Sequence, residues 1–306
     1  MSFQLTILGT GSANPVLSRN PTAHHLMIEH DGYLIDCGEG TQIQLLKYKI
    51  KATRIKYIFI THLHGDHFFG LIGLLSTLNM HHRLEDLYIY GPAGLADIIT
   101  IQLKYSDTRL NFKIHFEETR SNESYMLLEN EHVKVTTIPL IHRVPCCGFL
   151  IEEKTKPRKI VKELLPADVT IEQIKQLKEG IDVLDDNGKV LYATKHYTTA
   201  APQADSYAFC SDTLYHESII DIVKGVKLLY HEATFLHELE ERAAETFHTT
   251  AHQAGLIAQK AGVGKLLIGH FSSRYRDITP FWTEVQAIFP NAEVAEDGRV
   301  IDFRDF

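Results

Sequence analysis

The most constraining feature of this sequence is a cluster of ionisable side chains set between two apolar segments. The run KYIFI is followed by His62, His64, Asp66 and His67, and the chain becomes apolar again in FFGLIGLL. Burial of unpaired ionisable groups is unfavourable, whereas a bound metal ion neutralises and coordinates them. The cluster comes where a predicted strand ends and a predicted helix begins, which is where open α/β sheets place their sites. We therefore expect a metal site here.

The spacing within the cluster favours two metal ions rather than one. In an extended segment the side chains of His62 and His64 point to the same side. Asp66 and His67 follow after Gly65 bends the chain, so they can face a second point nearby. Imidazole and carboxylate ligands suit zinc best, with manganese or iron as alternatives. The competing interpretation is a polar loop in which Asp66 caps the next helix, but the density of coordinating side chains argues against it.

Three further ligand-type side chains follow other predicted strands. His142 comes after HVKVTTIPLI, Asp212 ends SYAFCSD, and His270 ends KLLIGH. A lone histidine in such a position is more often an ordinary residue than a ligand. Because all three come where a strand meets a loop, we expect them to converge on one edge of the sheet.

The alternation of strand-like and helical segments predicts an α/β fold. In the first half, strands are expected at residues 3–8, 24–30, 33–38, 56–61 and 86–92, and helices at 40–49 and 67–78. The later strands are expected at residues 206–212, 226–234 and 265–271. A late helix should run from about Thr250 to Ala261, because Thr249 or Thr250 can cap its start and Gly262 can end it.

A segment of different character, residues 153–196, separates the two halves. We interpret it as an inserted arm, rich in charge, with basic side chains at Lys154, Lys156, Arg158, Lys159 and Lys162. Charge runs of this kind are usually solvated helix surfaces, and contact with a substrate is the alternative.

Composition limits the classes of partner and compartment. The formal net charge of -8 argues against general affinity for nucleic acid, because phosphate binding depends on Lys and Arg. The four cysteines show no C-x-x-C pairing, which indicates reduced and mostly buried thiols. We find neither a long apolar run nor a secretory leader, and we expect a cytoplasmic protein without a membrane or DNA partner.

The H-x-H-x-D-H loop resembles that of metallo-β-lactamase-fold hydrolases. The resemblance narrows to the ribonuclease Z family, endoribonucleases that trim the trailer from the 3′ side of precursor tRNA, through LGTGSANP, RNPTAHHL, LIDCGEGTQIQL, THLHGDHFFGLIGLL, IYGP, YAFCSDT, HEATF, FHTTAHQAG and IGHFSSRY. It implies an αββα four-layer sandwich, with residues 1–306 as a single catalytic domain and the arm as a tRNA-binding protrusion. The arm departs from the family pattern, since it lacks a Gly-Pro-Pro-Gly-like run.

Carried over position by position, the resemblance implies one zinc ion bound by His62, His64 and His142. A second zinc ion is implied at Asp66, His67 and His270, and Asp212 would bridge the two. The family also implies a homodimer, in which the arm of one subunit could hold tRNA for the site of the other.

The expected mechanism needs no serine or cysteine nucleophile. Two zinc ions can present a shared hydroxide to the phosphodiester, and Asp66 can both ligate and accept the proton of the water. His248 in FHTT, held by Glu232 in HEAT, is the candidate acid that protonates the leaving 3′ oxygen.

The loop after His270 offers candidate substrate contacts, and the metal chemistry leaves alternative functions open. In HFSSRY, Ser272, Arg274 and Tyr275 follow His270 and could contact phosphate, with structural hydrogen bonding as the alternative. The same metal chemistry would serve a hydrolase of a small phosphodiester, thioester or lactone, because fold alone does not fix the substrate. An inactive metal- or RNA-binding subunit is the third hypothesis, and the presence of all seven candidate ligands argues against it.

Overall fold

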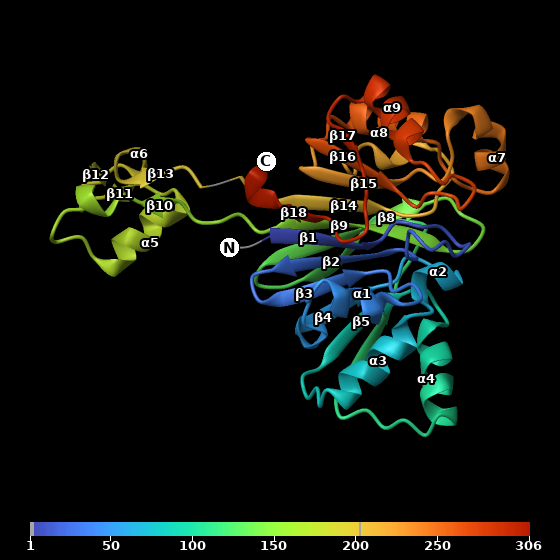
Figure 1. Cartoon of the computed structure of the whole chain (residues 1–306). Coiled ribbons are helices and arrows are strands. Elements are labelled where there is room, and N and C mark those ends of the chain that lie inside the picture. The colour runs from blue at the N-terminus through green and yellow to red at the C-terminus, as the bar shows by residue number, and fades with distance from the viewer. Residues whose placement is uncertain (1–2, 202) are drawn as a thin grey trace. The chain divides into compact units, whose positions relative to one another are not determined.

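Two seven-stranded sheets pack face to face in the computed structural model, which describes residues 3–201 and 203–306 (Figure 1). The strands of the first sheet, in spatial order, are β18 (Val300–Asp302), β1 (Phe3–Gly9), β2 (Ala23–Ile28), β3 (Asp31–Ile35), β4 (Ile55–Phe59), β5 (Leu87–Gly91) and β6 (Ile114–Glu118). Strands β3 to β6 run parallel, whereas β1 pairs antiparallel with both β2 and β18.

The second sheet draws most of its strands from the later part of the chain. In spatial order they are β17 (Ala292–Val294), β16 (Lys265–Gly269), β15 (Leu228–Glu232), β14 (Ser206–Cys210), β9 (Cys146–Glu153), β8 (Val133–Leu140) and β7 (Met126–Glu129). Strands β14 to β17 are parallel, so their carboxyl ends meet at one edge of the sheet.

Apolar side chains from both sheets fill the space between them. Leu5 and Phe59 of the first sheet share this core with Phe149, Phe209 and Tyr230 of the second. The rings of Phe59 and Phe149 lie 5.2 Å apart. Alternation of inward and outward side chains along each strand produces such a core.

Helices cover the outer face of each sheet, which completes four layers (Figure 1). The first sheet is covered by α1 (Thr41–Lys47), α3 (Leu71–Met80) and α4 (Leu95–Tyr105). The second is covered by α8 (Ala251–Ala261) and α9 (Thr279–Ile288). The predicted αββα sandwich is therefore confirmed. Among the described residues, none of the helices has the length and apolarity to cross a membrane.

Helix α8 begins and ends as its sequence predicts. Thr250 is the N-cap, and its hydroxyl accepts a hydrogen bond from the backbone N–H of Gln253 while the Gln253 side chain accepts from the N–H of Thr250. Gly262 ends the helix with φ 61°, a left-handed conformation that glycine adopts without strain. The four cysteines are free and buried, as expected.

The helix predicted over residues 67–78 is wrong in its details. The structure has a short helix α2 (Gly65–Phe68), a break at Phe69 and Gly70, and then α3. The break has a packing cause, because a β-carbon at Gly70 would come 2.0 Å from the carbonyl oxygen of Gly38. The N–H of Gly70 donates to Cys37 O over 2.9 Å, so the chain is held against the end of β3 at this point.

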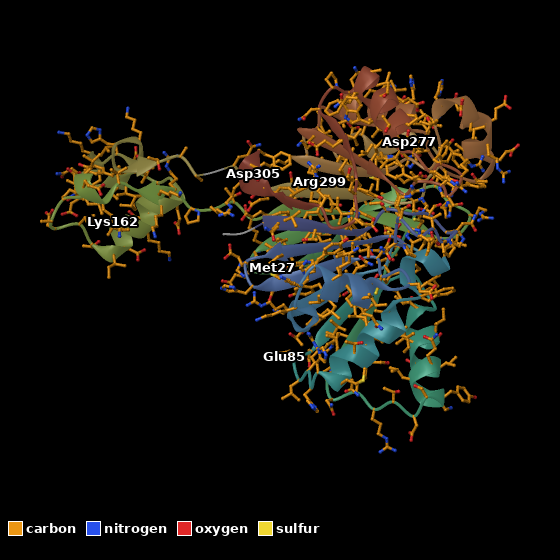
Figure 2. The ribbon with its side chains drawn as sticks, viewed as in Figure 1. Met27, Glu85, Lys162, Asp277, Arg299 and Asp305 are labelled. Atoms are coloured by element: carbon orange, nitrogen blue, oxygen red, sulfur yellow. The ribbon has the colours of Figure 1, made fainter. Side chains whose placement is uncertain are left out.

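Residues Glu152–Asp205 form a second compact unit. Its elements are β10 (Lys159–Ile160), the 3₁₀ turn Lys162–Leu164, α5 (Ile171–Glu179), β11 (Val183–Leu184), β12 (Val190–Tyr192), α6 (Thr194–Tyr197) and β13 (Thr198–Thr199). Leu177, Val183 and Tyr192 form its small core. The basic run that ends at Lys162, labelled in Figure 2, lies in loops, β10 and the 3₁₀ turn rather than on a helix.

Candidate metal centre

The predicted ligands of the second half all follow the ends of strands. His142 comes two residues after β8, Asp212 two residues after β14, and His270 directly after β16. The HLHGDH loop follows β4 in the same way. The structure brings these loops together, and the side chains fall into groups whose ligand atoms lie within 4.8 Å of one another.

The first group contains three histidines and one carboxylate. The nitrogens His62 Nε2 and His142 Nε2 each lie 3.1 Å from His64 Nδ1. Asp212 Oδ2 lies 3.6 Å from His62 Nε2 and 3.8 Å from His142 Nε2. Four donor atoms at these separations fit the tetrahedral shell that zinc prefers.

The second group contains Asp66, His67 and His270. Asp66 Oδ2 lies 3.3 Å from His67 Nε2 and 3.4 Å from His270 Nε2. Asp212 approaches this group with its other oxygen, Oδ1, at 3.5 Å from His67 Nε2 and 3.3 Å from His270 Nε2. One oxygen of Asp212 thus faces each group, which is the arrangement of a bridging carboxylate.

Two buried polar atoms support metal binding independently of the distances. His67 Nε2 and Asp212 Oδ1 are buried and have no hydrogen-bond partner among the described residues. An unsatisfied buried polar atom is strongly unfavourable unless a ligand such as an ion completes it. The donor set therefore fits divalent metal ions.

Each histidine that directs Nε2 into the cluster is held through its other ring nitrogen. His67 Nδ1 lies 2.7 Å from Asp36 Oδ2, His142 Nδ1 donates to Phe247 O over 3.0 Å, and His270 Nδ1 lies 2.9 Å from Thr234 Oγ1. Such contacts fix the orientation and tautomer of a metal-binding imidazole.

Asp36 was not among the predicted site residues, although it directly follows β3, much as the other candidates follow strands. Its carboxylate is fully buried and accepts hydrogen bonds from the N–H and hydroxyl of Thr61 as well as from His67. Burial raises the pKa of Asp36, and His67 opposes this rise. Burial by itself would lower the pKa of His67, but the carboxylates of Asp66, Asp212 and Asp36 raise it well above the usual value.

Glu232 and His248 lie beside the cluster and contact each other. His248 Nδ1 is 3.0 Å from Glu232 Oε1, and the ligand atoms of Asp212, His248 and His270 lie within 4.8 Å of one another. Burial opposes protonation of His248, but Glu232 and Asp212 outweigh it and raise the pKa of His248 to about 9. Glu232 and Asp212 thus favour the protonated form of His248.

The HFSSRY loop follows His270 and is tied to its surroundings. Arg274 is exposed, its Nε donates to Ser272 Oγ over 3.2 Å, and its guanidinium lies 5.0 Å from the centre of the Phe235 ring. The hydroxyl of Tyr275 instead accepts from the N–H of Leu236. Arg19 donates to the carbonyls of Ser272 and Tyr275, a contact that sequence reasoning missed.

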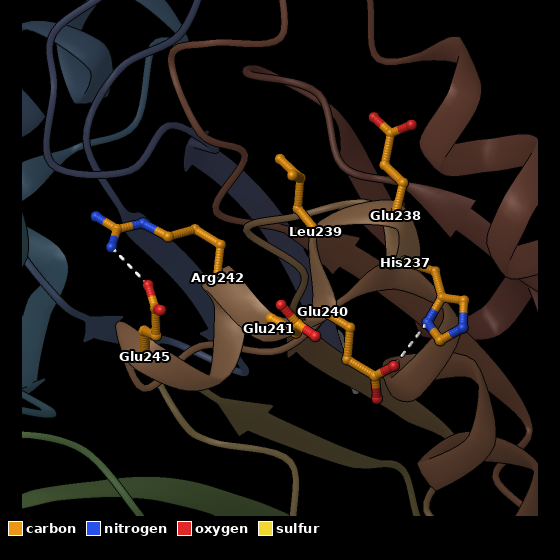
Figure 3. Close-up of a pocket in the computed structure, with 7 residues that line it drawn as sticks. All are labelled: His237, Glu238, Leu239, Glu240, Glu241, Arg242 and Glu245. Atoms are coloured by element: carbon orange, nitrogen blue, oxygen red, sulfur yellow. Dashed lines mark hydrogen bonds and ion pairs between the residues drawn. The ribbon is translucent and has the colours of Figure 1, made fainter.

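A shallow hollow on the 3₁₀ turn His237–Leu239 and α7 (Glu240–Glu245) precedes His248 in the chain (Figure 3). Its glutamates are Glu238, Glu240, Glu241 and Glu245, and the charge of two is offset by ion pairs, His237 with Glu240 at 3.5 Å and Arg242 with Glu245 at 2.9 Å. The acidic surface is unfavourable for the phosphates of RNA.

Comparison with known proteins decides the family. The ribonuclease Z of Cytophaga hutchinsonii is 50% identical over 298 residues, which cover 97% of this chain and 95% of the relative. The ribonuclease Z of Bacteroides thetaiotaomicron is 41% identical over 305 residues, covering 99% and 96%. This chain belongs to the ribonuclease Z family of endoribonucleases.

Solved structures agree with membership of the ribonuclease Z family. Human tRNase Z, short form, superimposes with a TM-score of 0.73 at 29% identity, covering 97% of this chain and 98% of the human one. The metallo-β-lactamase-fold protein YhfI of Bacillus subtilis, at 17% identity and a TM-score of 0.69 over 99% and 100% of the chains, shares the fold. A family model described as Anti-Pycsar protein Apyc1 matches residues 3–177, so the chain also belongs to that family.

Proposed function

We propose that the chain binds two zinc ions and removes the 3′ trailer from precursor tRNA, leaving a 3′ hydroxyl on the tRNA. The observation that carries this proposal is the Asp212 carboxylate, which directs one oxygen to each of the two ligand groups. Manganese or iron could replace zinc with the same ligands. Similarity to ribonucleases Z over nearly the whole chain favours an RNA substrate over a small phosphodiester, thioester or lactone.

Bound ions would lower the pKa of a coordinated water toward neutrality and place positive charge beside the phosphoryl oxygens. The residues of the chain supply the remaining steps. Asp66 carries a carboxylate whose pKa is lowered, because the neighbouring His67 and His270 outweigh its burial. An ionised carboxylate at this position can accept a proton from the attacking water.

His248 is the proposed general acid for the leaving 3′ oxygen. Glu232 supports this role, since its fully buried carboxylate accepts from His248 and from the backbone N–H of Thr213, Thr234 and Thr249. These bonds fix the carboxylate, so the imidazole of His248 is held in one orientation with its Nε2 free to donate.

The proposal assigns substrate contacts to Ser272 and Arg274 of the HFSSRY loop. The exposed guanidinium of Arg274 supports a phosphate contact, because it can form two hydrogen bonds to phosphate oxygens. The hydroxyl of Tyr275 is engaged by Leu236, which favours a structural role for it. We further propose that the basic side chains of the arm contact tRNA and that the enzyme works in the cytoplasm, where it acts on RNA rather than DNA.

A homodimer is part of the same proposal. Ile43 and Leu46 on α1 are 62% and 78% exposed and line a groove that also includes Ile50 and Thr77. A second subunit could cover this apolar surface. Sedimentation of the wild-type chain and of Leu46→Glu tests the idea: a monomeric wild-type chain at micromolar concentration would exclude it.

Cleavage of a trailer-bearing precursor tRNA tests the function directly. The purified chain should cut after the discriminator base and leave a 3′ hydroxyl, lose activity with chelator, and recover it when zinc is added back. Replacing Lys154, Lys156, Lys159 and Lys162 by glutamine should raise KM for the precursor and leave hydrolysis of bis(4-nitrophenyl) phosphate unchanged. Intact precursor together with metal-dependent hydrolysis of the small diester would overturn the substrate and keep the metal centre.

A further inference from the structure

One side chain in the ligand-bearing loop is exposed, and it is aromatic. From Thr61 to Gly70 every residue is buried or partly buried except Phe69, which is 62% exposed. Apart from the terminal Phe306, it is the one phenylalanine among the described residues that is neither buried nor partly buried. A single exposed apolar residue is ordinary by itself, so its surroundings must decide whether this ring has a role.

The backbone on both sides of Phe69 is fixed by packing. The N–H of Phe69 donates to Gly65 O over 2.9 Å, and Phe68 beside it is only 6% exposed. Gly70 is held against Cys37 and Gly38, as described above. The ring therefore projects from a rigid turn rather than from a loose loop.

The ring itself is also held in place. A β-carbon at Gly65 would come 2.2 Å from Cε2 of Phe69, so the ring lies directly on the glycine. The Phe68 ring meets it edge-on at 5.0 Å. One side of the ring is thus supported by the protein while the remainder faces solvent, an arrangement that loses little conformational entropy when a flat ligand binds.

Phe69 borders the metal centre. It lies three residues after Asp66 around the turn of α2, and side chains at this spacing are neighbours on a helix, with Cβ atoms about 5–6 Å apart. Asp66 belongs to the second ligand group, and Gly65, on which the ring rests, separates His64 from Asp66. The ring is therefore within one nucleotide's length of a phosphate bound at the metal centre.

We propose that Phe69 is a stacking platform for a nucleobase next to the scissile phosphate, and that it thereby positions single-stranded RNA for cleavage. The inference rests on the proposed ribonuclease function. All four bases offer a flat apolar face, so the contact would tolerate any base at that position. A protein partner is a poorer match for one ring, because a specific interface covers about 800 Å² per partner.

The test compares Phe69→Ala with Tyr105→Ala. Tyr105 is an 83% exposed aromatic at the end of α4, which spans Leu95–Tyr105 and so places it about 15 Å along the helix from the loop after β5. Single-turnover cleavage of precursor tRNA gives KM and the rate constant for each variant. Metal content by elemental analysis and sedimentation report whether the metal centre and the assembly are intact.

Phe69→Ala should lower the catalytic efficiency on precursor tRNA by about 5- to 150-fold, while Tyr105→Ala changes it less than about twofold. Phe69→Trp should retain activity and Phe69→Leu should lose most of it, because leucine has the apolar surface but not the flat ring. Metal content should equal that of the wild type in all four variants.

A second substrate isolates the stacking contact. In this RNA the nucleotides on both sides of the cut lack their bases. Phe69→Ala and the wild type should cleave it with equal efficiency, because there is no base to stack on the ring. The proposal would be overturned if Phe69→Ala lowered the catalytic efficiency by the same factor on the normal and the abasic RNA. It would also be overturned if Phe69→Ala and Tyr105→Ala had equal catalytic efficiency on the normal RNA. A change in sedimentation would assign the ring to a protein interface instead. If the wild type fails to cut precursor tRNA, the proposed function fails and this inference falls with it.

Discussion

Replacing His248 by alanine separates acid catalysis from metal binding. The proposed acid contributes about 10²–10⁴ in rate, which corresponds to about 2.7–5.5 kcal/mol of transition-state stabilisation. His248→Ala should lower the rate of precursor cleavage by this factor. It should leave the metal content unchanged, because His62, His64, His142 and the second group keep their donors.

The fold should survive this substitution. The carboxylate of Glu232 loses one partner but keeps the N–H groups of Thr213, Thr234 and Thr249 and the hydroxyl of Thr234. Loss of a hydrogen bond to a buried charged group costs about 1–3 kcal/mol, against about 5–15 kcal/mol for the stability of a typical domain. A thermal melt verifies this before kinetics are compared.

Two substrates with different leaving groups show whether His248 acts as the general acid. The 3′ oxygen of an RNA is a poor leaving group and needs a proton, whereas 4-nitrophenolate leaves without one. His248→Ala should therefore be severely impaired on precursor tRNA and within about tenfold of wild type on bis(4-nitrophenyl) phosphate. Equal losses on both substrates would mean that His248 acts on the metal centre or on positioning, and the acid assignment would be refuted.

Two further predictions follow from the buried network. Asp212→Ala removes the carboxylate shared by both ligand groups, so metal content should fall from two ions per chain at both positions, and elemental analysis showing two retained ions would refute the bridge. His24 is fully buried, its Nδ1 lies 2.7 Å from the Tyr207 hydroxyl, and burial lowers its pKa to about 3, so below pH 6.5 the unfolded chain binds a proton that the native chain does not. Stability should thus decrease as pH falls from about 6.5 toward 3, by about 1.4 kcal/mol per pH unit from this residue, and denaturant unfolding of His24→Gln should show a correspondingly smaller pH slope.

The sequence predicted the convergence of the ligands well because it depends on chain direction. Asp212 and His270 follow β14 and β16, parallel strands whose carboxyl ends meet at one edge, whereas His142 follows β8, which pairs antiparallel with β7. Their separations in sequence carry no information about contact. The prediction therefore relied on finding ligand-type residues at the ends of predicted strands, which is the information that an α/β fold makes useful.

Contacts that depend on three-dimensional packing could not be read from the sequence. The break between α2 and α3 arises because Gly70 approaches the carbonyl of Gly38, and the apolar run HFFGLIGLL reads as continuous helix without that neighbour. Arg19 reaches the carbonyls of Ser272 and Tyr275 across more than 250 residues of chain. Asp36 had a detectable signal, since it is an ionisable residue within the predicted strand at residues 33–38, but its partner His67 is identifiable only in the fold.

Backbone conformation links these unpredicted contacts to the chemistry. Asp36, Phe247 and His270 adopt left-handed φ angles of 56°, 58° and 63°, a conformation that is uncommon for residues other than glycine. Asp36 holds His67, Phe247 accepts from His142, and His270 is itself a ligand candidate. Asp36 and His270 directly follow β3 and β16, and Phe247 lies between α7 and α8. The packing of these elements sustains the strained conformations, and the side chains of the candidate site are held in position as a result.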